Sequence, residues 1–215
     1  TGGVDYAKIE NARLLTSSVY TLNEYLGYVA LRTTLQTNQV LAISFEFTYG
    51  GQTFQVGEFS SDLKDNDKAL FVKLLKNTSN SPKIGNWDLM MKNVYSLGAN
   101  QMSSDNFELY LQYRNDSVGT EMQYLMEGAV KGKQLLRVMN LDRLDARNNT
   151  SPDGRFDYVE GYTALSSSGR IIFPVLGPFG SHLAKAIGDP KIAEKYIFQE
   201  LYDSTLVMAQ ELSEK

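Results

Sequence analysis

The sequence contains no cysteine and a single histidine. Without a thiol the chain can form no disulfide, no thiolate nucleophile and no cysteine-ligated zinc site. The lack of cysteine does not fix the redox compartment, because it suits an oxidising and a reducing space equally. The one imidazole, His182, lies in GSHL without a serine elbow or another hydrolase signature. We therefore expect a structural role for it.

Long apolar runs are also missing, since no segment approaches the ~18 residues that a membrane-spanning helix needs. No secretory signal is present, and the chain opens on Thr1 instead of Met. We expect residues 1–215 to be one water-soluble domain excised from a larger protein. The polar stretch NTSNSPKIGN at 77–86 has the composition of a loop, and it is the expected boundary if the chain forms two lobes.

An excess of basic residues is absent as well. The chain has 21 Lys and Arg against 25 Asp and Glu, which gives a net charge of −4. Nucleic-acid binding requires a concentrated basic face, and KGK at 131–133 is the longest basic cluster, so no nucleic-acid partner is expected. The glycine-containing phrases YGG and LGPFG lack the flanking residues of a phosphate-binding loop.

Aromatic residues are plentiful, with 13 Tyr and 10 Phe, and they mark the clearest element. In the stretch 40–59, apolar residues alternate with small or polar ones on both sides of Gly50-Gly51. This arrangement predicts a β-hairpin with one face buried. Its expected buried residues on the first strand are Leu41, Ile43, Phe45, Phe47 and Tyr49.

The rest of the chain predicts short strands and a few helices. Strands are expected at 28–33, 106–114 and 133–141, a second hairpin around SSSG at 166–169, a buried strand or short helix at 69–76, and helices at 87–98 and from Asp189 to about 212. The expected class is α+β, a mostly antiparallel β-sheet or sandwich with a mid-chain helix and C-terminal helices.

The stretch LDARNNTSPDGRFDYVEG at 144–161 has two interpretations. Oxygen-bearing residues from Asn149 to Glu160 fall at the offsets of a calcium loop, with Asp153, Asp157 and Glu160 as carboxylate ligands. However, the first ligand is Asn, Pro152 stiffens the loop and the flanks have strand character. We favour a Pro-Asp-Gly turn whose carboxylates bond nearby backbone, with calcium as the alternative. No other cofactor is expected.

The aromatic strands also allow two interpretations. Alternating Phe and Tyr could form a platform on which sugars stack, as in a secreted carbohydrate-binding β-sandwich module. Packing in the core is the favoured role, because aromatic residues mostly serve packing. It predicts full burial of Phe45, Phe47, Phe107 and Leu109, and an exposed row of rings would favour the sugar platform. Paired catalytic carboxylates cannot be located from sequence spacing.

Several phrases occur together in one order along the chain. They are VDYAKIENARLL, YTLNEYLGYVAL, FEFTYGGQTFQVGEF, WDLMMKNVYSLGA, NLDRLD, SPDGRFDYVEG, GRIIFPVLGPFGSHL and YIFQELYDST. This set resembles the SprA family (also called Sov) of cell-surface gliding-motility proteins of Bacteroidetes. The resemblance spans nearly the whole chain.

The resemblance implies an outer-membrane role, since the family forms the translocon of the type IX secretion system. That translocon is a very large single-chain β-barrel that passes folded proteins to the cell surface. Its implied partners are an accessory barrel protein, a periplasmic plug, other secretion subunits and secreted cargo. The chain could be a soluble insert at the rim or could include lipid-facing strands. The expected helices and the polar composition favour the insert.

We therefore expect a domain without catalytic activity, at the outer membrane or cell surface, that docks a partner, gates the pore or guides cargo. Loops on a rigid scaffold carry recognition, which points to PVLGPFGSHL and NNTSPDG. Gly177, Phe179 and His182 are the candidate contact residues in the first of these loops. Gly177 stands where the resemblance leads us to expect an acidic residue, so a charge contact from that position is in doubt.

Overall fold

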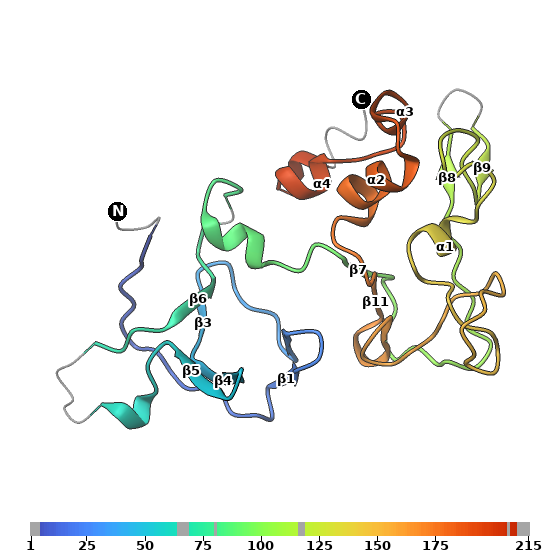
Figure 1. The fold of residues 1–215 in the computed structure, drawn as a ribbon. Coiled ribbons are helices and arrows are strands. Elements are labelled where there is room, and N and C mark those ends of the chain that lie inside the picture. Colours follow the sequence, from blue (N-terminus) through green and yellow to red (C-terminus); the bar gives the residue numbers. More distant parts are fainter. Residues whose placement is uncertain (1–4, 64–68, 80, 116–118, 206, 210–215) are drawn as a thin grey trace. The chain divides into compact units, whose positions relative to one another are not determined.

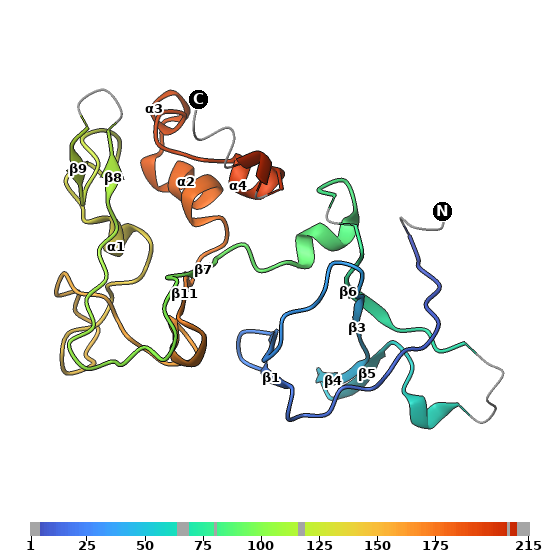
Figure 2. The ribbon, with the colours of Figure 1, turned by 180° about the vertical axis from the view of Figure 1, so that it is seen from behind.

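The computed structural model describes residues 5–63, 69–79, 81–115, 119–205 and 207–209 (Figures 1 and 2). The chain divides into two compact units, Thr1–Met90 and Met91–Lys215. The division falls shortly after the polar stretch at 77–86. Small antiparallel sheets and short helices make up both units, so the α+β class is confirmed, although the sheets do not form a clear sandwich.

The N-terminal unit consists of three antiparallel strand pairs and two 3₁₀ turns. Its elements are β1 (Tyr20–Asn23), β2 (Tyr28–Leu31), β3 (Leu41–Ile43), β4 (Phe45–Tyr49), β5 (Gln52–Val56), η1 (Ser60–Asp62), β6 (Lys73–Lys76) and η2 (Gly85–Leu89). The pairs are β1 with β2, β3 with β6 and β4 with β5. Each sheet in this unit therefore has only two strands, which leaves little surface on which a core could form.

The predicted hairpin is confirmed for β4 and β5. Gly50 and Gly51 have φ of 59° and 78°, the left-handed values that a two-residue type I′ turn requires and that glycine adopts without strain. Phe47 lies directly opposite Phe54 in the register. The prediction that Leu41 continues the same strand is wrong, because Leu41–Ile43 forms β3 and pairs with β6 instead.

The prediction that one hairpin face is buried is also wrong. Phe45, Phe47 and Phe54 keep 41%, 44% and 41% of their surface exposed, and Tyr49 keeps 77%. The physical reason is that the described residues of this unit leave the face partly uncovered. Among its described residues no apolar side chain is buried, and the only buried residue is Asn77.

The C-terminal unit carries the hydrophobic core and most of the helices. Its elements are β7 (Val94–Ser96), β8 (Tyr113–Arg114), β9 (Glu121–Met122), α1 (Leu135–Val138), β10 (Ala164–Leu165), η3 (Ser166–Ser168), β11 (Arg170–Ile172), η4 (Pro178–His182), α2 (Leu183–Ile187), α3 (Pro190–Ala193) and α4 (Glu200–Asp203). β11 is the central strand of the sheet β10-β11-β7, and β8 pairs with β9. Leu125, Met139, Leu141, Ile171 and Ile187 are at most 1% exposed.

Several expected elements differ from the observed ones in this unit. The helix predicted at 87–98 is a 3₁₀ turn that ends at Leu89, followed by β7, because 94–96 pairs with β11. The strand predicted at 133–141 instead contains α1. The helix predicted from Asp189 is interrupted: α3 and α4 are separate, and residues 207–209 are helical again. Between α3 and α4 the chain leaves the helix and Phe198 N–H bonds the Phe179 carbonyl at 2.7 Å. Residues 206 and 210–212 of that prediction lie outside the described residues.

Two further predictions hold in part. The hairpin around SSSG is confirmed, with β10 and β11 joined through η3 and Gly169. Gly169 has φ of 59°, and a Cβ there would overlap the Ala99 carbonyl, so this turn requires glycine. In the strand predicted at 106–114 only Tyr113–Arg114 pairs as β8, yet the alternation of inward and outward side chains extends through the whole segment. Phe107 and Leu109 are packed on the core but only half-buried, so full burial is wrong for them too.

Candidate functional site

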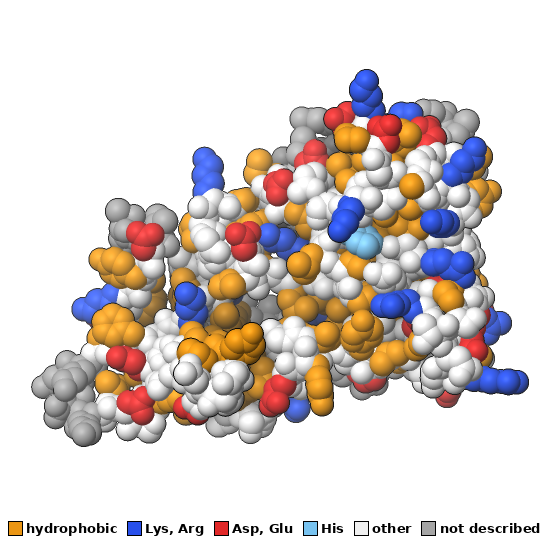
Figure 3. Space-filling model, in the orientation of Figure 1, with side chains coloured by type: hydrophobic (Ala, Val, Ile, Leu, Met, Phe, Trp, Pro, Cys, Tyr) orange, Lys and Arg blue, Asp and Glu red, His pale blue; other side chains and the backbone are white. Residues whose placement is uncertain are grey.

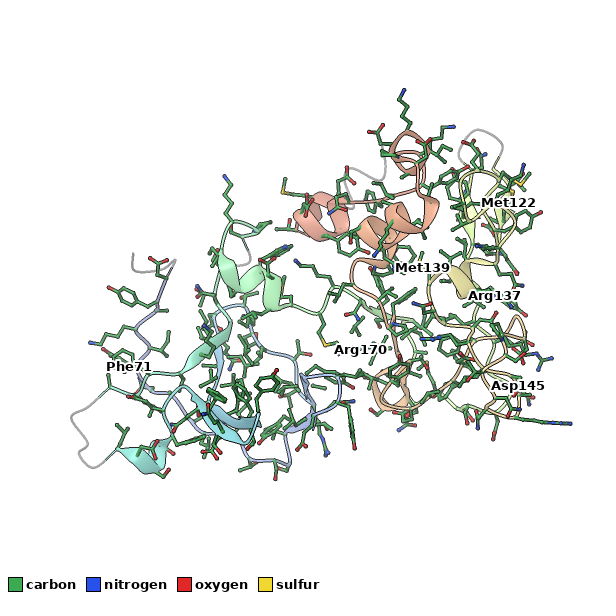
Figure 4. The ribbon with its side chains drawn as sticks, viewed as in Figure 1. Phe71, Met122, Arg137, Met139, Asp145 and Arg170 are labelled. Atoms are coloured by element: carbon green, nitrogen blue, oxygen red, sulfur yellow. The ribbon has the colours of Figure 1, made fainter. Side chains whose placement is uncertain are left out.

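The loop 142–157 has a first arm at 142–144 and a second arm at 153–157. A carboxylate on each arm accepts hydrogen bonds from backbone amides of the other arm. Asp142 is fully buried, and it accepts hydrogen bonds from Asp153 N–H at 2.9 Å and Gly154 N–H at 3.2 Å. Arg137 Nε lies 3.7 Å from the same carboxylate and supplies its counter-charge from α1 (Figure 4). The cost of burying the Asp142 charge is therefore offset by two amides and a guanidinium.

Asp157, on the second arm, accepts hydrogen bonds from backbone amides of the first arm. Its carboxylate accepts from Arg143 N–H at 2.6 Å and from Leu144 N–H at 3.2 Å, and its own N–H bonds the Leu141 carbonyl at 2.8 Å. Partial burial raises the pKa of Asp157 above its usual value, and the two backbone bonds act against that rise. The two arms are thus joined by four amide-to-carboxylate contacts, with Asp142 and Asp157 as acceptors.

Asp145 closes the tip of the loop (Figure 4). It accepts from the N–H of Arg147 at 2.8 Å and from the N–H of Asn149 at 2.9 Å. The Asn149 side-chain amide also bonds this carboxylate, and that contact, together with the backbone bonds, lowers the pKa of Asp145. The Asn-rich sequence of the loop therefore stabilises its own backbone turns.

The three calcium candidates each accept a bond from a nearby backbone N–H. Asp153 accepts from Arg155 at 3.0 Å, Asp157 accepts as described, and Glu160 accepts from Ser166 at 3.1 Å. In the part of the chain that the structure describes, no group of three or more His, Cys, Asp or Glu side chains could hold a metal ion. The bond from Arg155 to Asp153 is the one that a Pro-Asp-Gly turn makes, whereas Asp157 and Glu160 bond backbone farther away along the chain. Calcium binding stays a prediction.

The candidate contact residues of the 177–182 segment are largely engaged inside the C-terminal unit. Gly177 has φ of 54° and is the N-cap residue that precedes η4. The Phe179 ring packs edge-on against Tyr95 and Phe173, with centroids 5.4 and 5.3 Å away. Phe179 N–H also donates to the Tyr202 hydroxyl at 2.8 Å. The side chain of Phe179 therefore anchors the segment to the core.

His182 is half-buried, and its Nε2 lies 2.8 Å from the carbonyl of Val138, the last residue of α1 (Figure 3). A histidine that bonds the final carbonyl of a helix stabilises its C-terminus, which is the structural role expected for this residue. The sequence argument did not single out Leu176, which is 83% exposed on the same segment. Leu176 lies in the apolar stretch PVLG, and an apolar stretch is normally interpreted as buried.

The buried Tyr202 and the half-buried Tyr95 meet beside this segment. The hydroxyls of Tyr95 and Tyr202 lie 3.3 Å apart, and burial raises the pKa of both above the ordinary value. Both phenols therefore stay neutral at physiological pH. Their hydroxyls serve as hydrogen-bond groups that tie β7 and α4 to η4.

One side of the β4–β5 hairpin, which we call the aromatic face, carries the partly exposed side chains of Phe45, Phe47, Tyr49, Phe54 and Val56. Phe47 and Phe54 stack with centroids 5.3 Å apart and planes at 21°. The opposite side of the hairpin carries Glu46, Thr48, Thr53 and Gln55. Hydrophobic side chains gather openly over this hairpin in Figure 3. Apart from Gln52, which lies opposite Tyr49, the aromatic face is apolar, and exposed apolar patches of this kind often mark interaction surfaces.

No helix in the described ranges is long and apolar enough to cross a membrane. No protein-family model matches this chain, and no curated protein matches it.

Proposed function

We propose that this chain is a non-catalytic docking domain of an outer-membrane protein-secretion translocon, of the type IX kind that also serves gliding motility. The sequence phrases described above support the family. The observation that carries the docking role is the aromatic face on a unit whose described residues bury no apolar side chain. Other secretion subunits and cargo would be its partners, and the rest of a larger protein would hold it at the outer membrane or cell surface.

The energetics favour a covered aromatic face. An isolated two-stranded hairpin is marginal in water, and it becomes stable when an apolar face packs on something else. Burying a phenylalanine side chain contributes about 1.5–3 kcal/mol relative to full exposure. Phe45, Phe47 and Phe54 each leave roughly two fifths of that gain unrealised, because 41–44% of their surface is exposed. A partner that covers the face would recover it.

Site-specific photo-cross-linking tests this proposal in the full-length protein within isolated outer membranes. A benzophenone amino acid at Phe47 lies on the aromatic face, and the same probe at Thr48 lies on the polar side of the same strand, which makes it a matched control. We expect cross-links from position 47 to another part of the translocon or to a secretion subunit, and few from position 48. Equal yields at both positions, or cross-links only to cytoplasmic proteins, would contradict the proposal.

The exposed rings also favour a second candidate, the carbohydrate-binding module. Sugar rings stack on exposed aromatic planes, and Tyr49 adds a hydroxyl beside Phe47 and Phe54. The rings of this face pack against each other, since the Phe45 and Phe47 centroids are 6.1 Å apart and Phe47 stacks on Phe54. Mutual packing reduces the flat ring surface that a sugar could cover. Titration with soluble oligosaccharides separates the two. Binding that Phe47→Ala abolishes would support the module, and no binding at millimolar sugar would leave only the docking role.

A further inference from the structure

The segment that leads into β8 has the side-chain alternation of a strand without a strand partner. Phe107, Leu109 and Leu111 pack against the core, while Glu108 and Tyr110 are exposed. Between 108 and 112 no backbone group bonds another backbone group among the residues that the structure describes. In Figures 1 and 2 this part of the chain runs as an extended segment into β8.

The β8–β9 pair fixes the direction of the unpaired groups. Asn115 N–H donates to the Thr120 carbonyl at 3.0 Å, so these two residues form a hydrogen-bonded pair. Along an antiparallel strand alternate residues direct their main-chain groups to opposite sides. The main-chain N–H and C=O groups of Tyr113 therefore face β9, where Tyr113 pairs with Met122. The even-numbered residues of 108–114 direct their N–H and C=O groups to the opposite edge.

An edge of this kind is a template for another strand. Proteins usually protect such edges with proline, lysine or a bulge, and FELYLQYR at 107–114 has neither proline nor lysine. Its outward side chains are polar while its inward ones already pack on the core. What this segment lacks is therefore a hydrogen-bond partner for the main-chain groups along its edge, because its apolar side chains are already packed.

We propose that residues 108–114 pair with the same segment of a second copy of this chain, antiparallel and centred on Leu111. In this register Glu108 of each copy lies opposite Arg114 of the other, and Tyr110 lies opposite Gln112. The symmetry makes both charge pairs identical, as a two-fold interface requires.

The chemistry of the segment selects this register and a second copy. The hydrogen-bonded pairs fall at even positions, 108 with 114 and 110 with 112, which are the positions whose main-chain groups face the edge. A shift of the register by one residue would place even positions opposite odd ones, whose main-chain groups face away from the edge. A shift by two residues would separate Glu108 from Arg114. The segment is thus complementary in charge to itself. Within its own copy Arg114 also lies opposite Glu121 of β9.

Sedimentation equilibrium of the purified chain tests the pairing. We expect a reversible dimer, because each hydrogen-bonded pair and each Glu–Arg pair adds to the interface. Glu108→Arg turns both charge pairs repulsive and is expected to raise the dimer dissociation constant roughly tenfold. The triple variant Glu108→Arg, Arg114→Glu, Glu121→Arg reverses the charges together, and it should restore the wild-type constant.

Three further variants make the result specific. Gln112→Pro removes an edge N–H and should abolish the dimer, with near-UV circular dichroism reporting whether the C-terminal unit stays folded. Glu194→Arg makes the same charge change at an exposed position outside the segment and should leave the constant unchanged. Phe47→Ser tests whether the aromatic face holds the copies together instead.

The outcomes separate cleanly. A monomer at every concentration overturns the proposal, even if the edge proves to accept a strand from another protein. A dimer that tolerates Glu108→Arg, or one that only Phe47→Ser disrupts, overturns it as well. Weaker dimerisation of Glu108→Arg and recovery in the triple variant support it. Neither result depends on the docking role proposed above.

Discussion

At the scale of single residues, the carboxylates of the Asn- and Asp-rich loop act mainly on the backbone. Asp142 and Asp157 each hold two amides of the opposite arm, and Asp145 holds the tip. The turn itself could be predicted, because Pro-Asp-Gly and Asx turns depend on neighbouring residues. The buried cap at Asp142 could not, since its partners are 11 and 12 positions away and nothing local marks that carboxylate as buried.

The two perturbed carboxylates predict opposite pH effects. The pKa of Asp145 is lowered, so the unfolded chain binds its proton more tightly. Its stabilisation is fully present above the unfolded pKa near 3.9 and is lost as the pH falls through the lower folded value. The pKa of Asp157 is raised, so its ionisation costs stability as the pH rises from below the unfolded value through the folded one.

Carboxyl-carbon NMR titration between pH 2 and 6 measures both effects in the folded chain. We expect Asp145 to titrate below a model peptide and Asp157 to titrate above it. Asn149→Ala should move the Asp145 midpoint upward, since it removes the largest cause of the shift, and it should leave Asp157 in place. An Asp145 midpoint equal to that of the model peptide would refute the hydrogen-bonding scheme at the loop tip.

At the scale of elements, those specified by neighbouring residues could be predicted from the sequence, and those specified by long-range strand pairing could not. The β4–β5 hairpin could be predicted because two glycines and an alternating pattern specify it within twelve residues. The helix expected at 87–98 could not be corrected from its own residues, because Val94 and Tyr95 are drawn into β7 by Ile172 and Ile171 of β11. Burial of the aromatic face depends on what covers it, which periodicity does not encode.

Two truncations should separate the core from the aromatic face in the isolated chain. Met139 is 1% exposed in the core, so Met139→Ala should lower the free energy of unfolding by about 2–5 kcal/mol. Phe47 is 44% exposed, so Phe47→Ala should cost about 1 kcal/mol or less. Urea unfolding followed by tyrosine fluorescence measures both. A loss at Phe47 as large as that at Met139 would mean that the face is buried within the chain.

At the scale of the whole molecule, the two units differ in how they are held together. The C-terminal unit has a continuous core of buried apolar residues, against which further partly buried side chains pack. The N-terminal unit has three two-stranded sheets and, in its described residues, no buried apolar side chain. Composition alone could not reveal this difference, because both units are rich in Tyr, Phe and Leu.

The central claim is that the aromatic face is covered only in a larger assembly. Hydrogen exchange followed by mass spectrometry, on the isolated chain and on the full-length protein in outer-membrane vesicles, measures this directly. We predict that the amides of 45–56 exchange at least tenfold more slowly in the vesicles, while those of 135–141 change little. Equal exchange at 45–56 in the two samples would contradict the account.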